Sequence, residues 1–348
     1  MDLVSVIITS YCGSKNIRRS ILSVLNQTYS NIELIIVDDN DPFSMEREKT
    51  EAVIGTIHDI RINYIKHNKN MNGSAARNTG IAAAKGKYIQ LLDDDDYLFP
   101  EKISKSLEAL EKHSDCSMVV TGVISYGKLG VADLSGALKE SGNCVISKEW
   151  MLRFNALGTG SNIFATKESI VGINGFDASY PRMQDIEFIF RYCQKYSVCA
   201  IPTRLIIKDL NDRPVKVKSY RKHKEVISKF ITQFEDEIYR LLGDDLARKW
   251  FDEQYSHLFR IALMNGSKED LIEARDILQK YRELSSVEKL KMRFLPIWRL
   301  LRENELLRKL VLKKREGRTV REGLEQKLSV CEKEQVDVYI EKFWTLQN

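Results

Sequence analysis

Apolar and polar residues alternate along the first 125 residues in two different rhythms. Short, nearly continuous apolar runs, as expected of buried strands, occupy residues 3–9, 32–37, 60–65 and 87–92. Between these runs, apolar residues recur at helical spacing in residues 14–27, a polar helix-like stretch follows residue 39, and residues 73–85 form an Ala-rich segment. The alternation predicts a parallel β-sheet with helices on both faces.

Polar residues stand where three of these predicted strands end. Thr9 closes the first strand, Asp38 and Asp39 close the second, and residues 93–96, four consecutive aspartates, close the fourth. Ligands of open α/β sheets bind at the carboxyl ends of the strands. The three clusters therefore predict one binding site at this edge of the sheet.

The four aspartates need compensation because like charges repel. Carboxylate oxygens suit Mg²⁺ or Mn²⁺, and Mg²⁺ is commonly held by one or two carboxylates together with substrate phosphates. A solvated acidic turn is the alternative. Residues 72–80 (NGSAARNTG) supply a phosphate partner, since Arg77 lies near a helix N-terminus and both features attract anions. A surface arginine on a packing helix is the alternative there.

Two common nucleotide-binding motifs are absent from the sequence. No G-x-G-x-x-G follows the first strand, which disfavours nicotinamide and flavin enzymes, and no G-x-x-x-x-G-K-[ST] marks a P-loop. The carboxylates of Asp38 and Asp39 can instead accept hydrogen bonds from a ribose hydroxyl or the N–H of a base.

The second half of the chain has a different pattern. Residues 117–125 have the composition of a strand and residues 185–196 that of a helix, while the chain beyond residue 218 is mostly helical and charged. Residues 285–316 carry ten Lys or Arg and four Asp or Glu, a local excess of +6 in a chain of net charge +5. Such a local excess argues against a nucleic-acid partner and for one specialised basic surface.

Within that basic segment, apolar residues recur at helical spacing among the cations. A basic amphipathic helix with Trp and Phe is typical of an interfacial helix on anionic lipid. A helix docked on the catalytic domain or on a second copy of the chain is the alternative.

The composition, 43% hydrophobic and 30% charged, indicates a folded, soluble protein. No signal peptide and no membrane-spanning run is evident in the sequence. The six cysteines are scattered without a C-x-x-C pair, so we expect reduced thiols in a cytoplasmic protein.

Four motifs carry a family resemblance. In order and spacing, residues 6–11 (VIITSY), 27–39 (QTYSNIELIIVDD), 73–80 (GSAARNTG) and 88–96 (YIQLLDDDD) resemble the family 2 glycosyltransferases. Those are inverting enzymes that use nucleotide-diphosphate sugars. The resemblance implies an α/β fold of GT-A type, a Rossmann-like nucleotide-binding sheet with helices on both faces, here followed by a mainly α-helical C-terminal region.

The resemblance also implies a division of the chain. Residues 1–217 would form the catalytic domain, with nucleotide-sugar binding in 1–125 and the acceptor side and catalytic base in 126–217. Residues 218–348 would form a helical region at a membrane surface or in an oligomer.

Roles follow from the motifs position by position. Thr9 and Tyr11 would line the nucleotide pocket, and Asp39 would contact the base or ribose, with Asp38 as a neighbouring candidate. Arg77 would face the diphosphate. Asp93 and Asp95 would form the D-x-D element that holds Mn²⁺ or Mg²⁺. Direct metal contact is expected mainly from Asp95. Two departures are Thr9 and Cys12 where the family has Pro and Asn, and Asp94 where it has Ser, a charge for which the sequence offers no purpose.

The catalytic base of the family is the aspartate of a Glu-Asp pair that opens a helix. Asp185 matches it, preceded by Gln184 rather than Glu, with Glu187 as the runner-up and a helix-capping aspartate as the alternative. Trp150 and the loop at 158–162 are candidates for the acceptor pocket. His223 is a candidate third metal ligand, with a solvated surface histidine as the alternative.

The expected function is transfer of a sugar from a nucleotide-diphosphate sugar, with a UDP-sugar as the expected donor, to a saccharide or lipid-linked saccharide in bacterial capsule, exopolysaccharide or O-antigen synthesis. The expected location is the cytoplasm or the inner face of the plasma membrane. Two rivals are a sugar-nucleotide nucleotidyltransferase, for which residues 9–15 match poorly, and a non-catalytic nucleotide-sugar-binding partner of an assembly complex.

Overall fold

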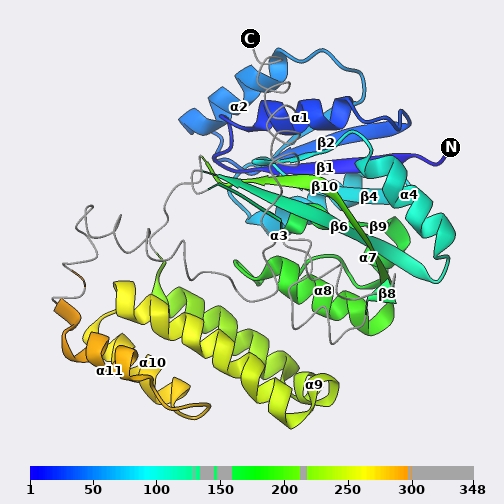
Figure 1. The fold of residues 1–348 in the computed structure, drawn as a ribbon. Helices are drawn as coiled ribbons and strands as arrows, with labels where there is room; N and C mark the ends of the chain where they lie inside the picture. Colours follow the sequence, from blue (N-terminus) through cyan, green and yellow to red (C-terminus); the bar gives the residue numbers. More distant parts are fainter. Residues whose placement is uncertain (128–129, 134–144, 147–158, 212–217, 297–298, 300–348) are drawn as a thin grey trace. The chain divides into compact units, whose positions relative to one another are not determined.

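The computed structural model describes residues 1–127, 130–133, 145–146, 159–211, 218–296 and 299. These residues divide into two compact units, one that ends by residue 211 and one that begins at residue 218. The first unit is an α/β domain and the second is helical (Figure 1).

One mixed sheet runs through the first unit, in the order β3-β2-β1-β4-β9-β6-β10-β5. Its strands are β1 (Val4–Ser10), β2 (Ile32–Asp38), β3 (Ile62–Lys66), β4 (Tyr88–Asp93), β5 (Asp96–Leu98), β6 (Cys116–Gly127), β9 (Phe164–Thr166) and β10 (Ser197–Asp209). Two short strands extend it: β7 (Gly130–Asp133) pairs with β6, and β8 (Val145–Ile146) pairs with β10.

The two halves of the sheet differ in strand direction. Strands β1 to β4 are parallel, as the alternation in the sequence predicts. Beyond β4 the sheet is mixed, because β9 runs antiparallel to both β4 and β6, and β5 runs antiparallel to β10. The expectation of a parallel sheet, made from residues 3–92, is therefore confirmed for β1 to β4.

Helices cover both faces of the sheet, as predicted. One face packs against α1 (Ile17–Leu25), α2 (Met45–Gly55) and α4 (Lys102–Lys112), and the other against α3 (Gly73–Ala83), α7 (Lys167–Gly172) and α8 (Gln184–Lys195). Along β1, Val6 and Ile8 enter the first core while Ile7 enters the second. Side chains of a strand alternate between faces, so a strand buried on both faces must be apolar throughout.

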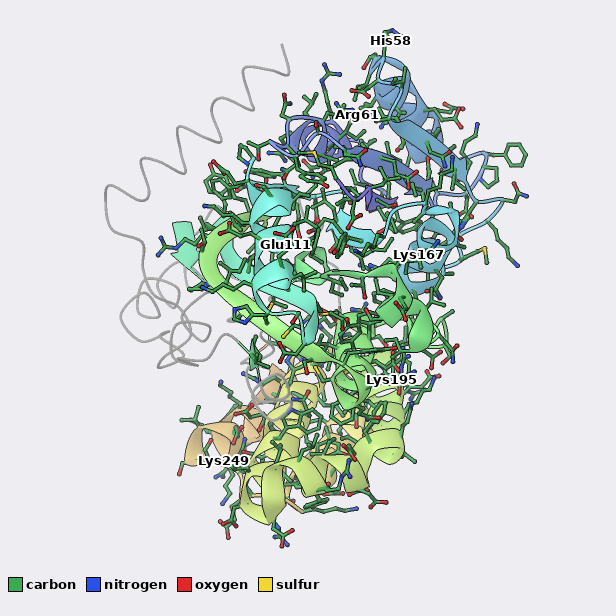
Figure 2. The ribbon with its side chains drawn as sticks, turned by 90° about the vertical axis from the view of Figure 1, so that its right-hand side faces the viewer. His58, Arg61, Glu111, Lys167, Lys195 and Lys249 are labelled. Carbon is green, nitrogen blue, oxygen red and sulfur yellow. The ribbon has the colours of Figure 1, made fainter. Side chains whose placement is uncertain are left out.

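The helices of the second face lie close to the sheet and to one another. A Cβ at Gly80 of α3 would lie 2.3 Å from Cγ2 of Ile7, so glycine is needed for this close approach. Lys167, the first residue of α7, donates to the carbonyl of Ala84 beyond α3, and Lys195 of α8 donates to that of Gly172 (Figure 2). These contacts fix α7 and α8 beside α3.

The second unit is built on α9 (Tyr220–Asn265), α10 (Lys268–Leu278) and α11 (Ser286–Arg293). The chain leaves helical geometry within α9 at Gly243, whose φ of 69° is unstrained only for glycine. Ser267 and Ser285 form capping boxes at the starts of α10 and α11. Arg299 donates to the carbonyls of Ala262, Leu263 and Gly266 at the end of α9, where a cation is favourable.

Within the described part of the chain, no helix combines the length and the apolar character needed to cross a bilayer. The described cysteines Cys12, Cys116, Cys193 and Cys199 form no disulfide, in agreement with the sequence.

Candidate active site

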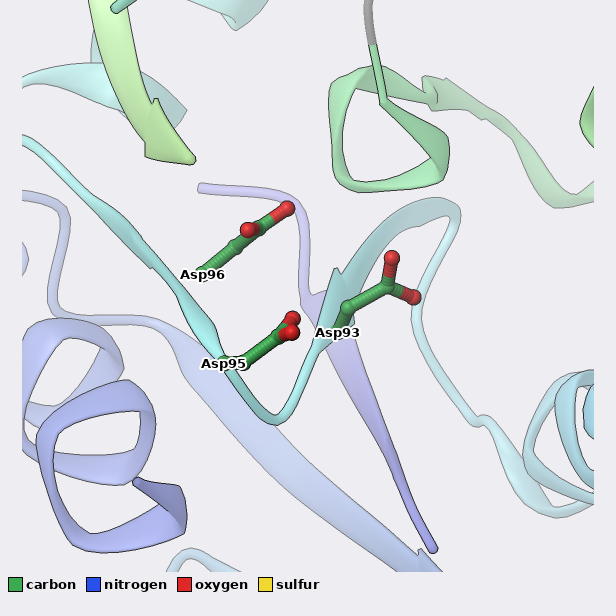
Figure 3. Close-up of side chains that lie close together, drawn as sticks. All are labelled: Asp93, Asp95 and Asp96. Atoms are coloured by element: carbon green, nitrogen blue, oxygen red, sulfur yellow. The ribbon is translucent and has the colours of Figure 1, made fainter. Parts of the chain in front are cut away.

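Three aspartates meet where β4 turns into β5. Asp93 is the last residue of β4 and lies opposite Thr9 of β1, and Asp96 is the first residue of β5. One ligand atom from each of Asp93, Asp95 and Asp96 lies within 4.8 Å of the other two (Figure 3). The structure thus brings together the two predicted metal ligands and adds a third carboxylate.

Asp96 is the member of this cluster that sequence reasoning missed. Its side chain is fully buried, and its Oδ2 accepts hydrogen bonds from the hydroxyls of Thr159 and Ser161, both at 2.7 Å. Ser161 Oγ also accepts from the backbone N–H of Asp93 at 3.0 Å. The described part of the 158–162 loop therefore lies beneath the acidic cluster and fixes its geometry, whereas Gly158 and Trp150 lie outside the described residues.

The structure supplies a contact for Asp94, which the sequence left unexplained. Its Oδ2 accepts from the backbone N–H of Tyr11 at 3.1 Å, in the loop after β1. A Cβ at Gly13 would lie 1.8 Å from the same oxygen, so the carboxyl occupies the space that glycine leaves. Burial, with the neighbouring charge of Asp95, raises the pKa of Asp94 to about 8. A largely neutral Asp94 at pH 7 adds little to the repulsion within the cluster.

Arg77 connects the acidic cluster with the start of α8. Asn72 caps α3 by accepting from the N–H groups of Ser74 and Ala75, which places Arg77 in the second turn of that helix. Its Nη2 lies 2.7 Å from Asp93 Oδ1, and its Nη1 donates to Gln184 Oε1 at 2.8 Å. The predicted diphosphate-facing arginine and the predicted base helix are thus in direct contact.

Asp185 lies in the first turn of α8, directly after Gln184. The N-cap of α8 is Met183, in the left-handed conformation, so Asp185 is not the helix cap. Its Oδ1 accepts from the backbone N–H of Ile186 at 3.0 Å, and the side chain is half-buried. Glu187 is buried and paired with Arg191, which makes it a poor candidate for a base.

The turn before α8 is held by side chains of two helices. Arg191 of α8 donates to the carbonyls of Ile173 and Gly175. Asn78 of α3 accepts from the N–H of Phe176 at 2.9 Å and donates to its carbonyl at 2.7 Å. Asn78 belongs to the motif at 73–80, but its partner is 98 residues away, and local sequence patterns do not reveal such a contact.

Asp38 and Asp39 are both buried at the end of β2, with different surroundings. Asp38 pairs with the guanidinium of Arg47 at 3.1 Å, accepts from Tyr64 at 2.6 Å and accepts twice from Asn40. This carboxylate is held by the protein itself, which favours a structural role over contact with a nucleotide.

The carboxylate of Asp39 keeps more hydrogen-bonding capacity. Its Oδ1 accepts from His67 Nδ1 at 2.7 Å and from the N–H of Met71 at 2.8 Å, while Oδ2 accepts from Asn70 at 3.1 Å. His67 is fixed in turn by Thr79. Because a carboxylate oxygen has two lone pairs, Oδ2 can accept one further donor from a ligand.

Two predicted residues of the first strand and its loop occupy the same edge of the sheet. Thr9 pairs in register with Asp93, and Tyr11 is 48% exposed in the loop that Asp94 holds. His223 belongs instead to α9 of the second unit, where its Nδ1 contacts the carbonyl of Ser219 and its ring lies near that of His257.

Comparisons with known proteins agree with this geometry. The family model described as Glycosyl transferase family 2 matches residues 5–160, which include the acidic cluster, Arg77 and Asp39. The match covers a little under half of the chain, and over these residues the sequence is similar to glycosyltransferase family 2. The resemblance seen in the four motifs is thereby confirmed.

Curated relatives carry glycosyltransferase names. WfaP of Escherichia coli, a "UDP-Glc:alpha-D-GlcNAc-diphosphoundecaprenol beta-1,3-glucosyltransferase", is 38% identical over 135 residues, 36% of this chain and 52% of the relative. The amylovoran biosynthesis glycosyltransferase AmsB of Erwinia amylovora is 29% identical over 192 residues, 54% of this chain and 62% of the relative. The chain spans about half the length of the first of these relatives.

The fold is shared with a solved protein. Staphylococcus aureus TarS, residues 1–349, matches with a TM-score of 0.51 at 12% identity, covering 84% of this chain and 91% of TarS. Its complex with UDP-GlcNAc matches with a TM-score of 0.54 at the same identity, with 84% and 92% covered. The predicted fold, a GT-A type domain followed by a helical region, is confirmed.

Proposed function

We propose that this chain is an inverting glycosyltransferase that moves a sugar from a UDP-sugar to a saccharide carried on a lipid. The observation that carries the proposal is the cluster of Asp93, Asp95 and Asp96 at the strand ends, joined through Arg77 to the helix that bears Asp185. The division of the described residues into a unit that ends by residue 211 and one that begins at residue 218 supports a catalytic domain over 1–217 and a helical region that starts at residue 218. The proposed end of that region at residue 348 lies outside the described residues.

The donor nucleotide would bind across the ends of β1 and β2. Asp39 Oδ2 offers an acceptor for an N–H of the base or for a ribose hydroxyl, and the exposed ring of Tyr11 offers a surface for the base. Thr9, next to them on β1, would complete this pocket. UDP-Glc in the name of WfaP and UDP-GlcNAc bound to TarS both support a uridine nucleotide.

The acidic cluster fits a divalent cation. Its three carboxylates offer hard oxygen ligands, and the spacing of at most 4.8 Å allows them to share one ion. Asp95 and Asp93 would hold Mn²⁺ or Mg²⁺, while Asp96, bound by two hydroxyls, would keep the turn in place. Such a cation supplies positive charge for the departing diphosphate.

Asp185 would act as the general base. An inverting transfer is a single displacement at the anomeric carbon, so a carboxylate must take the proton of the attacking hydroxyl. Asp185 follows Gln184, which Arg77 fixes on the donor side, and Glu187 is engaged by Arg191. Asn78 and Arg191, which hold the turn at Phe176, would keep this helix in register with the donor.

The name of one relative, WfaP, supports a lipid-linked saccharide as the acceptor. The name of WfaP specifies a sugar on diphosphoundecaprenol, and that of AmsB specifies amylovoran biosynthesis. An acceptor of this kind would place the protein at the cytoplasmic face of the plasma membrane.

The exposed face of α11 supports a membrane contact. Val287, Leu290 and Phe294 are 59%, 58% and 45% exposed at helical spacing, and Lys289, Lys291 and Arg293 lie among them. Apolar exposure beside cations suits an anionic lipid surface. Leu301 and Leu310, which the predicted segment 285–316 also contains, lie outside the described residues.

Vesicle flotation of the full chain tests the membrane contact. We expect binding to phosphatidylglycerol vesicles, little binding to phosphatidylcholine vesicles, and loss of binding in Leu290→Glu/Phe294→Glu. Equal flotation of the variant would contradict the proposal. Light scattering of both proteins reports whether the same face instead joins two copies of the chain.

A panel of nucleotide sugars tests the proposed activity. With Mn²⁺ and a diphosphoundecaprenol-linked sugar, we expect release of UDP from one UDP-sugar, and loss of this release in EDTA. Binding of UDP without turnover of any donor would favour the non-catalytic alternative. Release of pyrophosphate from a nucleoside triphosphate and a sugar phosphate would instead favour a nucleotidyltransferase.

A further inference from the structure

Arg77 makes two contacts of different chemistry with one guanidinium. Nη2 pairs with the charged Asp93 at 2.7 Å, and Nη1 donates to the neutral amide oxygen of Gln184 at 2.8 Å. The side chain is 12% exposed, and its charge lies over the ring of Phe176 at 5.4 Å from the centroid. Arg77 is therefore held firmly between β4 and α8.

Two glycines beside Arg77 and Gln184 leave the space that this arrangement needs. A Cβ at Gly160 would lie 3.3 Å from Arg77 Nη2, and a Cβ at Gly73 would lie 2.9 Å from Gln184 Oε1. Glycine therefore lies next to Arg77 on the side of the acidic cluster, at Gly160, and next to Gln184 at the start of α3, at Gly73. The surrounding residues thus fix the Arg77 guanidinium at the edge of the acidic cluster.

That position has an electrostatic consequence for the cluster. Arg77 neutralises Asp93, whose side chain is 30% exposed and whose oxygen belongs to the set that fits a cation. A divalent cation held by Asp93 would lie next to a fixed positive charge, and the two would repel each other. Negative phosphate oxygens of a donor would relieve this repulsion, since they can pair with both.

We infer that Arg77 is a built-in counter-ion that competes with the divalent cation for Asp93, and that neutral Gln184 holds it in place for this purpose. The inference rests on the proposed function. Without donor, Arg77 occupies Asp93 and keeps cation binding weak. With donor, the diphosphate draws Arg77 away from Asp93, so that cation and nucleotide favour each other's binding, and this coupling is reciprocal.

The identity of residue 184 determines how strongly Arg77 is drawn to α8. A glutamate there, as the family pattern has, would offer Arg77 a second carboxylate and weaken its hold on Asp93. The glutamine side chain accepts a hydrogen bond from one N–H group of Arg77 without neutralising the charge of the guanidinium. The glutamine at position 184 therefore keeps Arg77 on Asp93.

Titration calorimetry with Mn²⁺ alone, on the full chain, tests the inference. We expect Arg77→Gln to bind Mn²⁺ about tenfold more tightly than the wild type, because one positive charge beside the site is lost. Lys112→Gln, an exposed residue near the end of α4, is the charge-matched control and should leave the affinity unchanged. Unchanged or weaker Mn²⁺ binding by Arg77→Gln would overturn the inference.

Gln184→Glu tests the role of the amide. We expect about threefold tighter Mn²⁺ binding, and no such gain when the same change is made in Arg77→Gln, because the effect passes through the guanidinium. A gain that persists in the double variant would mean a plain charge effect and would refute the role of Gln184. Circular dichroism checks that each variant folds.

Repeating the titrations with UDP separates the inference from the proposed function. UDP should raise the Mn²⁺ affinity of the wild type by more than that of Arg77→Gln. An equal increase in both proteins would overturn the coupling while leaving glycosyl transfer intact. If transfer were absent but the Arg77 effect present, the proposed function would fail and the inference about the cation would stand.

Discussion

The donor side of the site and its acceptor side are held together by different kinds of contact. On the donor side, the carboxylates lie at or beside strand ends, and some of them are fixed by several partners, as Asp38 is by Arg47 and Tyr64 and Asp96 by Thr159 and Ser161. On the acceptor side, Asp185 lies in the first turn of α8, which is tied to the donor side through Gln184.

This difference indicates which side of the site is held in its geometry before substrates bind. The sheet fixes the donor carboxylates through main-chain register, so their geometry should persist in most single variants. The acceptor side depends on a few long-range side-chain bridges, from Arg77, Asn78 and Arg191. We therefore expect donor-side changes to affect binding and stability, and acceptor-side changes to affect turnover.

The largest effect is expected at Asp95. Asp95→Asn should lower glycosyl transfer by about a thousandfold or more, because the cation then loses a charged ligand. Mn²⁺-dependent UDP binding, measured by calorimetry, should weaken in parallel. If transfer fell while Mn²⁺ and UDP bound as tightly as before, Asp95 would not act in binding of the donor.

Replacement of Asp38 should lower the stability of the protein and leave catalysis unchanged. Asp38→Asn leaves the buried Arg47 charge without its partner, and breaking such a pair costs about 3–5 kcal/mol of unfolding free energy. Chemical denaturation of the first unit would measure this loss. At a temperature where the variant remains folded, its KM for the donor should match the wild type, and a raised KM with unchanged stability would restore Asp38 as a nucleotide contact.

Gly13 and Asp94 should behave as a pair. Gly13→Ala places a Cβ in the space of the Asp94 carboxyl, which should displace the Tyr11 loop and weaken UDP binding about tenfold, the cost of one lost charge-assisted or buried hydrogen bond. Asp94→Ser in the same chain makes room and should recover part of the affinity. The absence of any recovery would show that the two residues do not interact in solution.

An effect on stability alone is expected at Lys102, away from the site. Its side chain is fully buried, with Ser106 as a hydrogen-bond partner, and burial lowers its pKa to about 7. The unfolded chain therefore binds more protons than the folded chain between pH 7 and about 10.5, and stability rises with pH in that window.

Denaturation at two pH values measures this effect. The wild type should gain about 2 kcal/mol between pH 7 and pH 9 through Lys102, and Lys102→Met should lack this gain. An equal pH dependence in both proteins would mean that Lys102 reaches water in the folded state.

Periodicity and strand ends were sufficient to predict the nucleotide-binding half. Strands β1, β2 and β4 each have an apolar run that is buried on both faces, and the polar residue at its end then falls on one edge of the sheet. Strand β3, at the edge of the sheet, is only partly buried. The predicted acidic site at residues 93–96 follows from this rule, whereas the choice of Asp93 and Asp95 within it came from the family resemblance.

The remaining contacts depend on pairings that local patterns do not encode. Strand β9 inserts antiparallel between β4 and β6, about 70 residues after Asp93, and the turn just before it, which contains Thr159 and Ser161, contacts Asp96. The contact of Gln184 with Arg77 spans 107 residues. Sequence motifs identified the residues but not these partners, because packing of the two halves decides them.

In the proposed mechanism, the acidic cluster would bind the donor and Asp185 would remove the proton of the acceptor. Asp185→Asn is the most direct test, with donor binding and transfer measured on the same preparation. We predict that UDP affinity changes less than about twofold while kcat falls about 10²–10⁴-fold, the contribution of a general base. Turnover at the wild-type rate in this variant would contradict the account.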